Sequence, residues 1–269
     1  PGPGYSLRTP DDTLEIYDGA GQLQSITTRD GRSVVLSYES SPPAGQAPKL
    51  LTVTDDHGRS LSFSYYGSGA TTGAGNIQSI TDSADHVVSY GYDANNNLVT
   101  VTFPDSSVRT YVYNELAYTQ STSLPNAMTG IVDESNNRFA TFGYNTSGRA
   151  ISTEHAGGVD KFQFNFMSLH STTVVTDPLG VNHTYQFQTL QGVYKPVSIT
   201  PKCLICGGSI ATARGYDANG NLTSETDPNG NQTTRTFNTT RNLETQRIEA
   251  SNDTTGRKRT IQTDWNATF

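Results

Sequence analysis

Two cysteines are the residues whose type and spacing most directly suggest chemistry in this chain. Cys203 and Cys206 form a Cys-x-x-Cys motif, which supplies half of a four-ligand zinc site or closes a small disulfide loop in an oxidising compartment. The sequence holds no second such pair, and its five histidines lack the spacing of zinc ligands. A thioredoxin-like role needs a βαβ context that is absent here. A disulfide, unlinked thiols and a metal site stay open, with Cys203 and Cys206 only weak metal candidates.

The carboxylates lie almost entirely in segments rich in Asn, Gly and Pro. The run from Asp217 to Asn221 is similar to the first half of a calcium loop, but the twelfth position is Pro228 instead of a bidentate Glu. Asp side chains that open a turn can accept hydrogen bonds from backbone amides two residues on. We therefore predict turn capping at Asp18, Asp93, Asp177, Asp217 and Asp227.

No combination of a nucleophile with an activating base is visible. The Gly-x-Ser-x-Gly and His-Glu-x-x-His patterns are both missing from the sequence. The formal net charge of −7 and the pI near 5.1 argue against nucleic-acid binding, which needs a basic surface. No apolar run approaches the ~18–20 residues of a membrane span. We expect no enzyme activity, no catalytic residue and no cofactor.

The elements that position these residues follow an internal repeat. Aromatic residues recur at a spacing of 21 residues from Tyr17 to Tyr38, Tyr92 to Tyr113, Phe166 to Phe187 and Tyr216 to Phe237. Many precede Asp or Asn, and Asp-x-x-Gly segments such as Asp227 to Gly230 lie between them. The residues that define the repeat are Tyr17, Asp18, Tyr92, Asp93, Tyr113, Tyr144, Phe187, Tyr216, Asp217, Gly220, Asp227, Gly230 and Phe237.

Composition and alternation predict strands throughout. Hydrophobic residues make up 33% of the chain and charged residues 16%, and the remainder is rich in Thr, Ser, Asn, Gln and Gly. This favours a thin sheet wetted on one or both faces over a thick core. Aromatics at i and i+2, as in Phe162-Phe164-Phe166, share one strand face. We expect them to stack as ladders from repeat to repeat, and Asp30-Gly31 to form a two-residue hairpin turn with positive φ.

The Tyr-Asp-x-x-Gly-Asn-Leu run at Tyr216 to Leu222, its looser copy at Tyr92 to Leu98 and the Asp-x-x-Gly turns resemble the RHS/YD-repeat family. That family includes bacterial polymorphic toxins, the B and C subunits of insecticidal toxin complexes, wall-associated proteins and animal teneurins. The resemblance covers almost the whole chain. It implies an all-β fold of repetitive antiparallel β-hairpins, wound as a spiral strip that forms part of a hollow shell or solenoid.

The resemblance also implies a function. A segment of this kind is a structural shell or scaffold piece of a secreted or cell-surface bacterial protein, and it encloses or presents a C-terminal effector. Its partners are then the other repeats of its own longer chain, an enclosed toxin domain or further copies of itself. The alternative is an extracellular adhesion or fibre-forming module that acts by self-association or by contact with surface glycans. Asp177-Pro178-Leu179-Gly180 matches a signature of self-cleaving members, but its register indicates an ordinary repeat turn.

We expect residues 1–269 to form one repeat segment of a longer protein, because the aromatic-Asn pair Trp265-Asn266 begins a further repeat. Insertions rich in Gly, Pro or Ser interrupt the register. They are expected near residues 40–48, 67–75, 115–128 and 190–210. The Gly-rich segment 67–75 is expected to be a flexible surface loop, and the segment 115–128 to hold the only short helical turn.

Overall fold

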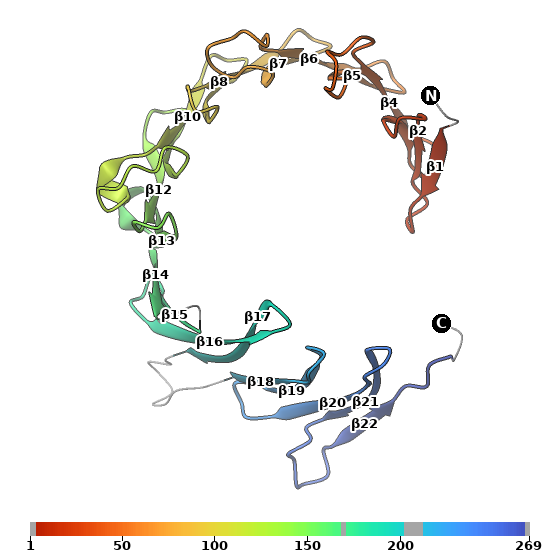
Figure 1. Ribbon diagram of the computed structural model, residues 1–269, viewed down its shortest axis with the longest axis vertical. Coiled ribbons are helices and arrows are strands. Elements are labelled where there is room, and N and C mark those ends of the chain that lie inside the picture. The colour runs from red at the N-terminus through yellow and green to blue at the C-terminus, as the bar shows by residue number, and fades with distance from the viewer. Residues whose placement is uncertain (1–3, 168–170, 202–211, 267–269) are drawn as a thin grey trace. The chain divides into compact units, whose positions relative to one another are not determined.

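The computed structural model describes residues 4–167, 171–201 and 212–266, with the side chain of Pro201 excepted. The chain divides into two units, residues 1–139 and residues 140–269. In each unit, each strand pairs antiparallel with its neighbours in chain order (Figure 1). The strands of the first unit are β1 (Tyr5–Arg8), β2 (Leu14–Tyr17), β3 (Leu23–Thr27), β4 (Ser33–Tyr38), β5 (Leu50–Asp55), β6 (Ser60–Tyr65), β7 (Ile77–Asp82), β8 (Val87–Tyr92), β9 (Leu98–Thr102), β10 (Val108–Tyr113) and β11 (Met128–Val132).

The second unit continues the same pattern. Its first strand is β12 (Arg138–Tyr144), whose first two residues belong to the first unit. The remaining strands are β13 (Ala150–His155), β14 (Phe162–Met167), β15 (Thr172–Thr176), β16 (Asn182–Leu190), β17 (Val193–Pro201), β18 (Thr212–Tyr216), β19 (Leu222–Thr226), β20 (Gln232–Asn238), β21 (Leu243–Glu249) and β22 (Arg259–Gln262). The all-β prediction is confirmed.

The strands of each unit form a single layer, so almost nothing is fully buried (Figure 1). Among the described residues, the buried hydrophobic side chains are Val101, Ala140 and Val181. Apolar residues still gather on one face of the first unit, where Ile26 pairs with Val34 and Ile80 with Val88. The expectation of a thin sheet without a thick core is confirmed.

The opposite face of the first unit carries small hydroxyl side chains. Ser37 shares a hydrogen bond of 2.6 Å with Thr52 on the next strand, and Ser64 shares one of 2.7 Å with Ser79. Each of these serines precedes a repeat tyrosine. At Tyr92 that preceding position is Gly91, where an added Cβ would collide with the Thr100 hydroxyl. Cross-strand crowding therefore keeps this position small.

Most hairpins end in one kind of turn. The N–H of its first residue bonds to the carbonyl of its fifth, and the N–H of its fourth bonds back to the carbonyl of its first. The fourth residue has positive φ, and it is Gly, Asn, Asp or Ser. This turn is the three-residue hairpin connection that contains a residue in the left-handed conformation. These turns begin at Thr9, Asp18, Thr28, Asp55, Asp82, Asp93, Phe103, Asp133, Asn145, Asp177, Asp217 and Asp227.

This geometry corrects one prediction from the sequence. The Asp30-Gly31 turn is not a two-residue primed turn, because the positive φ falls on Gly31 and not on Asp30. A two-residue hairpin occurs instead at Gln191-Gly192, where both residues have positive φ, 48° and 78°. It joins β16 to β17, so the expectation of an insertion over 190–210 is wrong for residues 193–201. Pro196 fits in β17 because it lies at a β-bulge. Residues 202–211 lie outside the described part.

Two further expectations need correction. The Gly-rich loop between β6 and β7 folds back on the sheet, with Gly73 buried against the rings of Tyr66 and Tyr92. The Gly73 N–H donates to the Asn96 Oδ1 at 3.0 Å, and the two rings meet edge to face at 5.9 Å. A glycine is needed because any side chain would collide with both rings. The loop after β10 does hold a 3₁₀ turn at Leu116–Tyr118, but a second one occurs at Ala156–Gly158.

Aspartates cap the turns as predicted. At Asp18, Asp93, Asp177, Asp217 and Asp227, Oδ1 accepts the N–H groups of the third and fifth turn residues at 2.8 to 3.0 Å. The side-chain amide of Asn231 also donates to Asp227 Oδ2, and these bonds lower the pKa of the Asp227 carboxyl. Asn145 occupies the same turn position and accepts the same two backbone bonds without a charge.

These caps predict acid sensitivity. Hydrogen bonds from nearby side chains and from backbone N–H groups of their own turns lower the pKa of the capping carboxyls of Asp82, Asp177, Asp217 and Asp227. Their contribution to stability is therefore complete above the unfolded pKa of about 4 and is lost as the pH falls through the lower folded values.

Asp227→Asn should keep the turn at pH 7, as Asn145 does naturally, and should weaken the decline of stability below about pH 4. Urea unfolding measured from pH 7 to pH 2.5 checks this. Asp227→Ala is the matched control, since it should already lose stability at pH 7. An unchanged acid decline in Asp227→Asn would contradict the assignment.

Candidate functional site

The repeat aromatics form a regular contact that the sequence did not predict. A β-bulge lies next to each of Tyr17, Tyr38, Tyr65, Tyr92 and Tyr216, so that the partner strand carries one extra residue. At the first of these, Tyr17 faces Leu23, while the preceding Ile16 faces Ser25. A bulge disrupts the ladder locally and leaves backbone groups in need of another partner.

The aromatic of a later repeat supplies that partner. The Tyr38 hydroxyl donates to the Leu23 carbonyl at 2.8 Å, opposite Tyr17, and the Tyr65 hydroxyl donates in the same way to Leu50, opposite Tyr38. The same bond links Tyr92 to Ile77 at 3.1 Å and Tyr216 to Pro196 at 3.0 Å. The indole Nε1–H of Trp265 donates to the Glu244 carbonyl at 2.7 Å. We call this contact the aromatic clasp.

The clasp changes the expected role of the aromatics. At these positions the repeats are joined by a side chain bonded to the backbone and not by one ring stacked on another. The described ring pairs are Tyr5 with Tyr17, stacked at 4.9 Å, and Tyr66 with Tyr92. The prediction of a stacked ladder is wrong at the clasp tyrosines, because consecutive repeat rings are two strands apart.

The remaining repeat-defining residues fall at consistent places. Tyr113, Tyr144, Phe187 and Phe237 each lie beside a bulge, and Tyr113 and Tyr144 also end their strands. Gly220 and Gly230 are the fourth residues of their turns, with φ of 81° and 84°. Cys203 and Cys206 lie outside the described residues, so the disulfide and metal alternatives both stay predictions.

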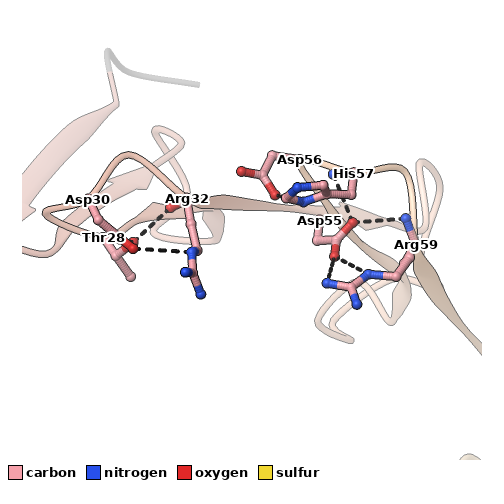
Figure 2. Close-up of polar contacts among 7 residues, drawn as sticks. All are labelled: Thr28, Asp30, Arg32, Asp55, Asp56, His57 and Arg59. Atoms are coloured by element: carbon pink, nitrogen blue, oxygen red, sulfur yellow. Dashed lines mark hydrogen bonds and ion pairs between the residues drawn. The ribbon is translucent and has the colours of Figure 1, made fainter.

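The most metal-like cluster among the described residues is Asp55, Asp56 and His57, whose ligand atoms lie within 4.8 Å of one another. Figure 2 shows the Asp55 carboxylate held by its own turn and by the Arg59 guanidinium. Asp55 Oδ1 accepts the N–H groups of His57 and Arg59, and Oδ2 faces Arg59 Nε at 2.7 Å. His57 Nδ1 lies 2.6 Å from the Asp56 carboxylate. The geometry is that of a capped turn, with a guanidinium where a cation would bind.

In the neighbouring turn, between β3 and β4, a hydroxyl side chain replaces the capping carboxylate. Thr28 takes the first position, and its Oγ1 bonds to the Asp30 carboxylate at 2.5 Å and to the Arg32 carbonyl at 3.1 Å (Figure 2). A cavity of about 420 Å³ is lined by residues of both turns. Its charged groups are paired within their own turns.

A second polar cluster holds the insertion after β10. Arg138 donates two bonds to the Glu115 carboxylate, at 2.7 and 2.8 Å, and a third to the Thr129 carbonyl at 2.8 Å. The fully buried Thr129 donates its hydroxyl to Glu115 at 2.7 Å. The Arg138 guanidinium lowers the pKa of Glu115 and lies over the Tyr118 ring. An added Cβ at Gly130 would displace it.

The second unit carries a row of charges from β18 to β22. Arg214 faces Glu225 at 3.0 Å, Arg235 lies 3.7 Å from both Glu225 and Glu244, and Arg247 lies 3.0 Å from Glu244. Each arginine of this row has a glutamate within 3.7 Å, on its own strand or on a neighbouring one. The corresponding face of the first unit is apolar instead, so the two units differ in what this face can contact.

Taken together, the geometry defines an all-β repeat protein whose strands add in chain order and are held by recurrent clasps and capped turns. The RHS repeat family model matches two segments of the chain, residues 72–108 and 216–260.

Solved structures share the fold. The chain is similar to the Tc holotoxin pore of Photorhabdus luminescens, with a TM-score of 0.51, 13% identity and 96% of this chain covered. It is also similar to TcdB2-TccC3, with a TM-score of 0.50 and 13% identity, and to TcdB2-TccC3 without its hypervariable C-terminal region, with a TM-score of 0.51 and 12% identity. The chain spans 16% of the length of each. No curated protein matches the chain. Within the described residues, no helix has the length and apolar character to cross a membrane.

The clasp predicts a difference between two tyrosines of β8. Tyr92→Phe keeps the ring but leaves the Ile77 carbonyl without its donor, so the free energy of unfolding should fall by about 1–2 kcal/mol. Tyr90→Phe is the matched control, since the Tyr90 hydroxyl makes no hydrogen bond within the described residues. Urea unfolding of both variants measures the difference. An equal loss of unfolding free energy in the two variants would contradict the role of the clasp.

The Glu115 cluster predicts that Lys cannot replace Arg138. A lysine cannot reach both carboxylate oxygens and the Thr129 carbonyl, so Arg138→Lys should cost about 1–2 kcal/mol, reduced by partial exposure. The control is Arg59→Lys, whose exposed side chain should cost less than about 0.5 kcal/mol. Thermal and urea unfolding compare them, and a similar loss in both would contradict the role assigned to Arg138.

Proposed function

We propose that the chain is a wall segment of a shell or scaffold in a secreted or cell-surface RHS-repeat protein. One observation carries the proposal: the strands form a single layer that adds repeat by repeat, without a core of its own. Such a sheet gains stability from contacts between neighbouring repeats. A single-layered sheet provides a broad surface without a thick core, which suits a wall better than an active site.

The two faces of the first unit support the same function. One face carries apolar and aromatic side chains, and the other carries uncharged serines and threonines. On the apolar face, Leu61 pairs with Val53 and remains exposed. Apolar surface of this kind on a soluble sheet is expected to contact other protein. In the proposal that protein is a C-terminal effector domain of the longer chain, enclosed by further repeats.

The second candidate is an extracellular adhesion or fibre-forming module. A sheet that ends in an open strand can pair with another copy, and polar turns can contact surface glycans. The charge row of the second unit favours this candidate over a uniformly apolar lining. Both candidates are structural, and neither needs a catalytic residue.

Electron microscopy of the full-length protein, combined with limited proteolysis, separates the two candidates. A closed particle whose C-terminal domain resists protease until acid or urea opens it is the expected result. A triple Tyr38→Phe, Tyr65→Phe, Tyr92→Phe variant should expose that domain at lower urea, while Tyr90→Phe should not. Filaments, or a C-terminal domain that is cleaved at once in the native particle, would overturn the shell.

A further inference from the structure

A groove in the second unit lies apart from the charge row and shares only Trp265 with the clasps. It has a volume of about 440 Å³ and is lined by residues of β20, β21 and β22 and by Trp265. This is within the ~300–1,000 Å³ range of small-molecule sites. It lies on the face opposite the charge row, because Thr236, Gln246 and Gln262 alternate with the charged residues along their strands.

The strand residues Thr236, Gln246 and Gln262 in the groove are uncharged and carry both hydrogen-bond donors and acceptors. Thr236 faces Gln246, and Gln246 faces Gln262, so one row of polar side chains crosses three strands. Within the described residues, neither glutamine amide is engaged in a side-chain hydrogen bond. An amide offers one acceptor oxygen and two donor hydrogens. Two adjacent free amides can therefore bond to neighbouring hydroxyl groups of a ligand.

Trp265 gives the groove an aromatic wall of fixed orientation. Its Nε1–H is held by the Glu244 carbonyl at 2.7 Å, and 48% of the residue is exposed. The clasp therefore sets the orientation of the indole while leaving much of its surface available. A flat apolar ring beside free polar groups is suited to a ligand with one apolar face and an edge of hydroxyls.

The charges at the groove exclude strongly ionic ligands. Arg241 and Asp264 both line it, and their charges cancel. The Arg241 guanidinium is already bonded to the Asn266 carbonyl at 3.0 Å. A phosphate would meet the Asp264 carboxylate, and a basic peptide would meet Arg241. A neutral ligand fits best.

We propose that this groove binds a neutral carbohydrate, with one sugar ring against the Trp265 indole and its hydroxyls bonded to the amides of Gln246 and Gln262. The proposal does not depend on the shell function, since a wall segment and a free module would present the same groove.

The test uses the sole tryptophan of the 269-residue chain as its own reporter. The probes are maltotriose, cellotriose, N-acetylchitotriose and lactose, each titrated while the indole fluorescence is recorded. At least one should give a saturable change in emission. Gln246→Ala and Gln262→Ala should each weaken that binding about tenfold, because each removes one ligand hydrogen bond.

Gln78→Ala, a glutamine on exposed strand surface in the first unit, is the matched control and should leave the titration unchanged. Unchanged circular dichroism and urea midpoints show that the variants remain folded. Calorimetric titration of Trp265→Phe, which should bind more weakly, gives a readout that does not need the indole. No saturable change with any of the four sugars, or a change unaffected by both glutamine substitutions, would overturn the proposal.

Discussion

The aromatic clasp is the contact on which the rest of the structure depends. A bulge beside one repeat aromatic interrupts the strand ladder, and the aromatic of a later repeat donates a hydrogen bond to the carbonyl opposite the first, as Tyr38 does to Leu23 and Tyr65 to Leu50. Each repeat is thus completed by its neighbour. Because the single layer has almost no buried core, these bonds and the cross-strand pairs bear most of the specificity of the fold.

The turns complement the clasps. An aspartate directly after the aromatic caps the next turn, so that Tyr92 with Asp93 and Tyr216 with Asp217 act as pairs. The aromatic joins a repeat to the one before it, and the acid stabilises the turn that leads into the following strand. Asp55 caps its turn in the same way although no aromatic precedes it, so the Asp55-Asp56-His57 segment is also a capped turn.

Regular repeats leave the faces of the sheet free to vary. The first unit has an apolar face opposite a face rich in hydroxyl side chains, whereas the second unit places arginines and glutamates on one face of β18 to β21 and a polar groove on the other. Insertions are added without disturbing the clasps, and the Gly73 loop and the Glu115–Arg138 cluster each settle on the sheet through their own polar bonds. A wall built in this way can acquire local binding surfaces at little cost to its architecture.

The sequence by itself determined the repeat, the all-β class and the turn caps, because these depend on local periodicity and on side chains that bond within five residues. Tyr216 to Asn238 contains most of that information. The tertiary structure alone decided the clasp, the folding back of the Gly73 loop and the neighbouring placement of Gln246 and Gln262. Each depends on strand register, and the bulges that shift the register by one residue leave no distinctive signal in the sequence. Trp265 was recognisable as a repeat aromatic, but only pairing across β20 to β22 placed two free amides beside it.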